Sequence, residues 1–320
     1  MPISRIPCVL LIMSFAMMTG VTTAALPAAE KLELPSLEVT SGGARTMVPA
    51  LLFRPPNTAA GATVPLIVGL HGCGGMYSTR PGSEAALSER FAMWTQAFLD
   101  DGYAVLWPDS FNPRGHRQLC TIRAGERTIN AATRRLDALG ALAFASALPG
   151  VDARRIAIVG WSHGGSATLA TVNAENAQVA ALRTGANAPP FFRAAVAFYP
   201  GCTASLRAGP RWRPATATAI HIGAADDWTP AQPCVALGEA MRAAAMPLTV
   251  RVYADSYHAF DAPTGRVAVR HDVPNGVNPG HGVTTGPNPA ARAAAMESTH
   301  TFLRAQLASP AAPNAATKVN

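Results

Sequence analysis

One serine of the chain stands in a setting that could make it a nucleophile. Ser162 is the centre of a G-x-S-x-G pattern at residues 160–164, and the pattern directly follows an apolar run at residues 155–159. A strand that turns sharply into a helix through this pattern holds the serine hydroxyl exposed, and its glycines leave room for neighbouring backbone. We therefore predict a nucleophilic serine at 162, the alternative being an ordinary Gly-rich turn.

A serine hydroxyl is a weak nucleophile at neutral pH and needs a base that an acid orients. Asp226 and Asp227 follow the apolar run at residues 219–222, and His258 follows the next such run, at residues 248–253. The chain order serine, acid, histidine, with each partner just beyond a later strand, is typical of this kind of triad. We predict His258 as the base and Asp226 as the acid, with Asp227 as the second candidate.

These residues need a sheet whose strand ends converge. Several short runs are apolar at nearly every position, which is typical of parallel strands covered on both faces. They span residues 51–54, 66–70, 104–107, 155–159, 194–199, 219–222 and 248–253. Helical segments alternate with them, at residues 84–101, 127–148, 163–175, 232–245 and 289–307. This alternation predicts one α/β domain with a mostly parallel central sheet and helices on both faces. Residues 262–286, rich in Gly, Pro and Asn, are expected to form a long excursion.

The composition restricts the class of protein. Of the 320 residues, 49% are apolar and 14% charged, which excludes a disordered chain. The net charge of +7 comes almost entirely from arginines, because Lys31 and Lys318 are the only lysines. The arginines are scattered and form no run of five or more, so we expect no nucleic-acid partner.

The first 25 residues have the pattern of a secretory signal. Arg5 precedes an apolar stretch at residues 6–18, and small residues surround Ala24 and Ala25. The stretch is too short for a membrane span, and no later one approaches 18 apolar residues. We predict export to the periplasm or the medium without membrane insertion after cleavage; a buried first helix is the alternative.

Cleavage near Ala25 would remove Cys8 and leave four of the five cysteines. The remaining cysteines are Cys73, Cys120, Cys202 and Cys234. Four cysteines in an oxidising compartment predict two disulfides, for which the count allows three connectivities. Their wide spacing and the lack of a C-x-x-C pair predict no zinc site.

Four motifs together resemble the dienelactone hydrolase family of the α/β-hydrolase superfamily. They are LHGCGG at residues 70–75, GWSHGG at 160–165, GAADDWTP at 223–230 and YHAFD at 257–261. The resemblance runs from about residue 47 to 307 and implies a catalytic domain at 47–308, after an N-terminal segment at 26–46. The composition of residues 309–320 predicts a disordered tail. Founding members carry a cysteine where Ser162 stands and are cytosolic, so the resemblance implies ester hydrolysis but not dienelactone as the substrate.

The resemblance also implies roles for the loops around the serine. Backbone N–H groups of His163 and of Cys73, or otherwise Gly74, would form the oxyanion hole. The strand order of the superfamily places Cys73 and Cys120 above neighbouring strands, and likewise Cys202 and Cys234. It therefore implies the disulfides Cys73–Cys120 and Cys202–Cys234, and no cofactor or metal.

Substrate-binding residues are suggested only by position. Trp161, Trp228 and Tyr257 lie near the predicted catalytic edge and could line an aromatic pocket, although core packing explains each one equally well. Arg114 lies at the same edge and could bind a substrate carboxylate, with a surface salt bridge as the alternative.

The sequence thus predicts an exported serine hydrolase that cleaves small-molecule or polymer carboxylic esters through an acyl-enzyme. A serine peptidase or polyester depolymerase on the same fold is the closest alternative. A catalytically silent binding protein is the alternative from another class.

Overall fold

A computed structural model describes residues 26–308 except 57, 60 and 185–189. The predicted signal segment and the predicted C-terminal tail therefore lie outside the described residues. Of the helices within the described part, none is long and apolar enough to cross a membrane.

Eight strands form one sheet in the order β1-β2-β4-β3-β5-β6-β7-β8. The strands are β1 (Glu30–Val39), β2 (Arg45–Phe53), β3 (Val64–Leu70), β4 (Ala104–Pro108), β5 (Val151–Trp161), β6 (Ala194–Phe198), β7 (Ala217–Gly223) and β8 (Leu248–Tyr253). Strand β1 pairs antiparallel with β2, and β2 antiparallel with β4, whereas all the other pairs are parallel. The expected mostly parallel sheet is confirmed.

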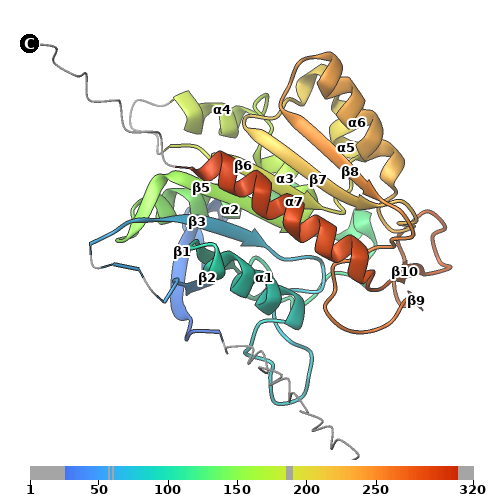
Figure 1. Ribbon diagram of the computed structural model, residues 1–320, viewed down its shortest axis with the longest axis horizontal. Coiled ribbons are helices and arrows are strands. Elements are labelled where there is room, and N and C mark those ends of the chain that lie inside the picture. The colour runs from blue at the N-terminus through green and yellow to red at the C-terminus, as the bar shows by residue number, and fades with distance from the viewer. Residues whose placement is uncertain (1–25, 57, 60, 185–189, 309–320) are drawn as a thin grey trace, which may run out of the picture.

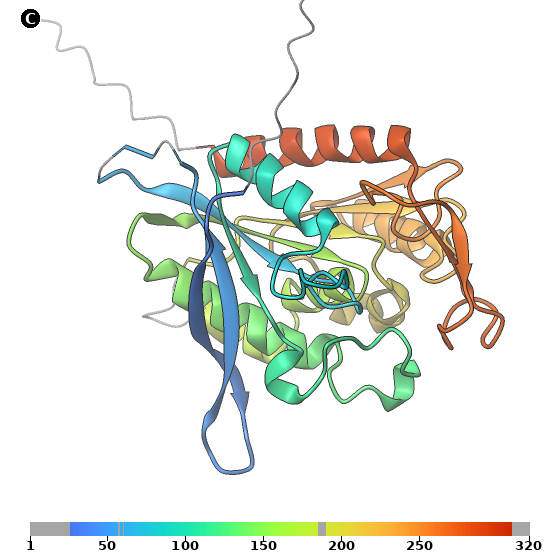
Figure 2. The same cartoon turned by 90° about the horizontal axis from the view of Figure 1, so that it is seen from below.

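Helices cover both faces of this sheet. They are α1 (Glu89–Asp100), α2 (Ala131–Ser146), α3 (His163–Thr171), α4 (Ala177–Thr184), α5 (Thr203–Ala208), α6 (Ala231–Ala243) and α7 (Pro289–Leu307). Figure 2 shows α1 and α7 on one face, with α2 on the other. Three begin with an asparagine cap, whose side chain accepts N–H groups of the first turn: Asn130 for α2, Asn176 for α4 and Asn288 for α7.

The central strands are buried on both faces, and their side chains alternate between two apolar clusters. Along β5, Ala157, Val159 and Trp161 pack with α1 and α7, whereas Ile156 and Ile158 pack with α2. Period-two alternation with apolar residues on both sides fits a parallel strand covered by helices on both faces.

Several element boundaries differ from those predicted. Strand β1 lies within residues 26–46, which the sequence places ahead of the domain, yet it continues the same sheet. Helix α1 begins at Glu89 instead of residue 84 because the chain before it turns back, with the Ser78 N–H donating to the Ala86 carbonyl. The excursion at residues 262–286, here called the β9–β10 loop, contains the short pair β9 (Ala268–Arg270) and β10 (Val283–Thr285) (Figure 1).

A buried histidine in the sheet makes stability depend on pH. His221 of β7 is 1% exposed and contacts the Tyr253 and Thr299 hydroxyls. Burial, and then the charge of Arg251, lower its pKa from 6.5 to about 3. The unfolded chain binds a proton at His221 more readily than the folded chain does. The stabilisation by neutral His221 is therefore complete above about pH 6.5, and it declines by about 1.4 kcal/mol per pH unit as the pH falls.

We expect His221→Asn to reduce the slope of the unfolding free energy against pH between pH 6.5 and 4. The reduction should correspond to nearly one bound proton. Urea unfolding at several pH values measures this slope. His71 and His163, whose pKa values burial also lowers, should keep the remaining slope above zero. An unchanged slope in the variant would show that His221 does not carry the effect.

Candidate active site

Ser162 sits at the sharp turn between β5 and α3, with φ 53° and ψ −115°. The positive φ is strained for a residue with a side chain, and surrounding contacts must hold it. A Cβ on Gly160 would lie 2.3 Å from the Gly164 carbonyl oxygen, and one on Gly164 would lie 2.0 Å from the Leu70 oxygen. Both glycines of the pattern are therefore required by close backbone approach.

A hydrogen-bonded series of three side chains runs from this serine into the protein. Ser162 Oγ lies 2.8 Å from His258 Nε2, and His258 Nδ1 lies 2.8 Å from Asp226 Oδ2. Asp226 and His258 are 4% and 3% exposed. A carboxylate accepts from Nδ1–H, so Nε2 is left as the acceptor for the serine proton. This geometry suits proton transfer from the serine to the histidine.

The ends of adjacent parallel strands bring the acid and the histidine together. Asp226 follows β7, His258 follows β8, and the Ala225 N–H donates to the Ser256 carbonyl at 3.0 Å. Asp226 Oδ1 accepts the N–H groups of Trp228 and Thr229, at 2.9 and 2.8 Å. Its oxygens are thus fixed by its own loop, with Oδ2 facing the imidazole.

The neighbouring acid points elsewhere. Asp227 Oδ1 accepts the Thr284 N–H at 2.7 Å, and Oδ2 accepts the Thr284 hydroxyl at 2.8 Å. Its own carbonyl accepts the Val277 N–H at 2.8 Å. Of the two candidate acids, the structure brings Asp226 to His258, while Asp227 anchors the β9–β10 loop.

Two N–H groups lie beside the serine without a protein acceptor. Among the described residues, neither the Cys73 nor the His163 N–H donates to a backbone or side-chain acceptor. The Gly72 loop lies against the turn that holds Ser162, since a Cβ there would be 3.5 Å from the Ser162 Cβ. Free N–H donors at this place, one of them at the start of α3, can stabilise negative charge on a substrate oxygen.

Disulfides join Cys73 to Cys120 and Cys202 to Cys234, the pairing that the resemblance implies. The first lies in the loop that carries the Cys73 N–H, and the Cys73 carbonyl accepts the Leu119 N–H at 2.7 Å. The second links the start of α5 to α6, near the strand ends that carry Asp226.

A cavity of about 190 Å³ opens over the serine. Among its lining residues are Trp161, Trp228, Tyr199, Arg90, Arg270 and both cysteines of the first disulfide. The Trp228 ring lies 4.7 Å from the His258 ring, and the Arg270 guanidinium lies 5.7 Å from the Trp228 ring. The β9–β10 loop therefore supplies one wall of the cavity.

Of the four predicted substrate-binding residues, two line the cavity and two do not. Trp228 and Trp161 both line the cavity. The Trp161 ring is also fully buried in the core, where its N–H donates to Asp261 at 2.9 Å. Tyr257 is not among the lining residues. Arg114 is not brought there either: its nitrogens donate to Glu38, Asp137 and the Ser110 carbonyl. Glu38 comes from the unforeseen strand β1, so the salt-bridge interpretation of Arg114 replaces the substrate-binding one.

The sequence alone assigns no role to Asp261, which is fully buried and contacts the cavity-lining Trp161 and Tyr199. It accepts the indole N–H groups of Trp94 and Trp161, the Tyr199 hydroxyl and an ion pair from Arg90 at 3.1 Å. The sequence signal for this residue is a carboxylate three residues after His258, in a segment that also contains Tyr257 and Phe260.

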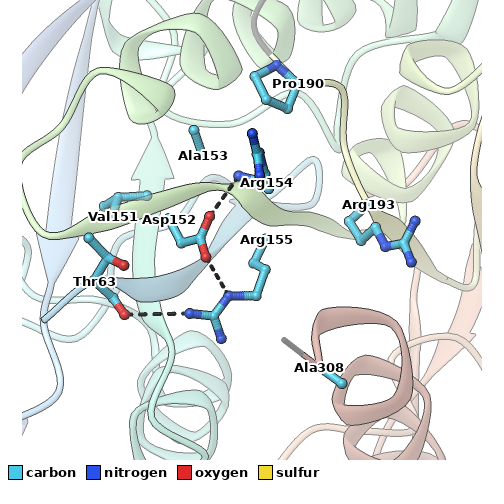
Figure 3. Close-up of a pocket in the computed structure, with 9 residues that line it drawn as sticks. All are labelled: Thr63, Val151, Asp152, Ala153, Arg154, Arg155, Pro190, Arg193 and Ala308. Carbon is cyan, nitrogen blue, oxygen red and sulfur yellow. Dashed lines mark hydrogen bonds and ion pairs between the residues drawn. The ribbon is translucent and has the colours of Figure 1, made fainter. Parts of the chain in front are cut away.

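A larger cavity, of about 680 Å³, lies at the opposite edge of the sheet (Figure 3). One ion pair lies in its wall, with Arg155 Nε 2.7 Å from Asp152 Oδ2, and the Arg154 backbone N–H donates to Asp152 Oδ1. It lies at the amino end of β5, whereas ligands of open α/β sheets bind beyond the carboxyl ends. Ser162 lies at that carboxyl end.

The parallel sheet and the serine at a strand-to-helix turn define an α/β-hydrolase. Residues 51–307 match the sequence profile of the dienelactone hydrolase family, and the chain belongs to this family. Among curated proteins, no sequence matches the chain.

Solved structures agree with this fold. Esterase 2 from Thermogutta terrifontis, phosphorylated by paraoxon, superposes with a TM-score of 0.59 at 18% identity, over 89% of this chain and 97% of that one. A dienelactone hydrolase-like promiscuous phosphotriesterase from metagenomic libraries gives 0.57 at 19% identity, over 88% and 99%. Dipeptidyl peptidase 4 from Porphyromonas gingivalis gives 0.58 at 18% identity, over 89% of this chain but 36% of that one.

Proposed function

We propose that the protein is an exported serine hydrolase that cleaves carboxylic esters through an acyl-enzyme. The observation that carries the proposal is the series Ser162 Oγ, His258 and Asp226, with 2.8 Å at each step. Membership of the dienelactone hydrolase family supports a hydrolase. The two disulfides support export, since disulfides persist in oxidising compartments.

In the first half-reaction Ser162 Oγ attacks the ester carbonyl carbon while its proton passes to His258 Nε2. Asp226 stabilises the resulting imidazolium, and the Cys73 and His163 N–H groups stabilise the oxyanion. The tetrahedral intermediate then collapses. The bond to the alkoxy oxygen breaks, His258 returns the proton to it, and the alcohol leaves.

In the second half-reaction a water molecule attacks the acyl-enzyme carbonyl and gives a proton to His258. The bond to Ser162 Oγ breaks, the serine recovers its proton, and the carboxylic acid leaves. The small cavity, about 190 Å³, supports esters with a short acyl chain, because ligand pockets for larger molecules usually exceed about 300 Å³.

The decisive experiment is labelling with a fluorophosphonate, followed by mass mapping and a substrate panel. We expect one adduct, on Ser162, and turnover of p-nitrophenyl acetate and butyrate. Peptidyl p-nitroanilides and polyester particles test the peptidase and depolymerase alternatives. Peptide turnover without ester turnover would favour the peptidase, and no labelling would leave a binding protein as the better interpretation.

The two disulfides offer a test of the Cys73 loop. Each closes a long segment, with separations of 47 and 32 residues, so removing either by double serine substitution should lower the unfolding free energy by about 4 kcal/mol. Only the Cys73/Cys120 variant should also lower kcat per folded molecule, by about tenfold, because only that bridge holds a proposed oxyanion donor.

The Cys202/Cys234 variant is the matched control for loop closure. Urea unfolding and kcat normalised to fluorophosphonate-reactive protein separate the two effects. Equal kcat in both variants would exclude a role for the first bridge in the oxyanion hole.

We further propose that the catalytic domain begins at or before Glu30 and ends near residue 308. Strand β1 supports the earlier start, because Glu38 on it pairs with Arg114 at 2.7 Å and thereby ties this strand to the loop after β4.

A further inference from the structure

A buried arginine lies behind the proposed oxyanion hole. Arg134 of α2 is fully buried, with 0% exposure. Its Nη1 donates to the His71 carbonyl at 2.6 Å and lies 3.2 Å from His163 Nδ1. One guanidinium nitrogen therefore contacts two chain segments that are 92 residues apart in sequence.

Each of these segments carries one of the two proposed oxyanion donors. His71 directly precedes the loop of Gly72 and Cys73, and its Nδ1 lies 2.9 Å from the Gly72 carbonyl. His163 itself supplies the other N–H, at the first position of α3. The spacing between the two donors thus depends on what joins His71 to His163, and Arg134 contacts both.

The surroundings keep this contact in one arrangement. The Phe111 ring lies 5.1 Å from the Arg134 guanidinium and 4.5 Å from the His71 ring. Because arginine only donates, His163 Nδ1 must be the acceptor, which places the ring proton of a neutral His163 on Nε2. Burial, and then the charge of Arg134, lower the pKa of both His71 and His163 well below 6.5, so both stay neutral.

Arg134 itself stays charged. Burial lowers its pKa to about 10, and Asp137 and Asp109 oppose that effect. Its Nε and Nη2 are buried and have no hydrogen-bond partner among the described residues. A buried cation with two unpaired donors opposes folding, and packing alone does not require a charge here.

From these contacts we propose that Arg134 is a positioning residue: it fixes the Cys73 and His163 N–H groups at the spacing that the oxyanion requires. The inference rests on the proposed ester hydrolysis by Ser162. Arg134 contacts no reacting atom and acts through the His71 carbonyl and the His163 ring.

The test compares Arg134→Met, Arg134→Lys and Arg135→Met. The last variant is the matched control, since Arg135 is the next residue of α2 and binds Gln178 away from the site. Hydrolysis of p-nitrophenyl acetate gives kcat and KM per fluorophosphonate-reactive molecule. Inhibition by a trifluoromethyl ketone, whose adduct with Ser162 carries an oxyanion, gives a Ki that reports the oxyanion hole directly.

We expect Arg134→Met to lower kcat by about 30- to 100-fold and to raise the Ki of the ketone in parallel, with KM changed by less than about threefold. Arg134→Lys should fall between this variant and the wild type, because one ammonium cannot replace the shape of the guanidinium. The control should stay within about twofold of the wild type. Unchanged kcat and Ki in a folded Arg134→Met variant would overturn the inference.

A fourth variant keeps the test valid if Arg134→Met does not fold. His163→Ala retains the backbone N–H but removes the ring that Arg134 contacts, so kcat should fall by about three- to tenfold and Ki should rise equally. In Arg134→Lys/His163→Ala the two effects should be smaller than additive. Additive effects, or none, would overturn the inference. Wild-type protein without labelling or ester turnover would instead refute the proposed function, so the two failures are distinguishable.

Discussion

Replacing Ser162 with alanine is expected to lower kcat for p-nitrophenyl acetate by about 10⁵- to 10⁶-fold. The substitution removes the atom that forms the acyl-enzyme, and no other hydroxyl is held 2.8 Å from His258 Nε2 within the described residues. The free energy of unfolding should change by no more than about 1.5 kcal/mol, because only one side-chain hydrogen bond is lost. Labelling by the fluorophosphonate should disappear together with activity.

Ser166→Ala provides the matched control for this change. Ser166 lies one turn further along α3, and its hydroxyl accepts the Gly201 N–H at 2.8 Å. This variant disturbs the same helix but leaves the proposed nucleophile, so labelling at Ser162 should persist. If Ser162→Ala keeps more than about one hundredth of the wild-type kcat, another nucleophile acts and the acyl-enzyme proposal is wrong.

The candidate triad could be predicted because local patterns determine its position. The pattern around Ser162 specifies a turn that only glycines allow, and the two partners follow apolar strands whose carboxyl ends must meet. The parallel order β5, β6, β7, β8 then brings residues 96 positions apart to a 2.8 Å contact. Neither step requires knowledge of how individual side chains pack.

The roles of Arg114 and Asp261 could not be predicted in the same way, because they depend on distant partners. Glu38 competes for Arg114 from a strand that carries several polar residues and lacks the continuous apolar run of the central strands. Asp261 accepts from Trp94, which is 167 residues earlier in the chain. Such pairings follow from the packing of helices onto the sheet, for which hydrophobic periodicity gives no side-chain detail.

The two adjacent aspartates have different contacts: Asp226 orients the proposed base, His258, whereas Asp227 supports the β9–β10 loop. Asp226→Asn is expected to lower kcat by about 10⁴-fold, because an amide donates toward His258 Nδ1 and so favours the tautomer whose proton occupies Nε2. The serine proton then has no acceptor. Shape and volume at the site are nearly unchanged, so the loss should appear in kcat, with little change in KM.

Asp227→Asn is the matched variant, since it makes the same chemical change one residue later. It weakens the two hydrogen bonds to Thr284 and so loosens the loop that places Arg270 and Thr285 along the cavity. We expect KM to rise about three- to tenfold, with kcat reduced by less than about tenfold, because a displaced cavity wall mainly affects substrate binding. Steady-state kinetics of both variants decide the assignment. A larger fall in kcat for Asp227→Asn than for Asp226→Asn would make Asp227 the acid, and the contact of Asp226 with His258 would then be structural.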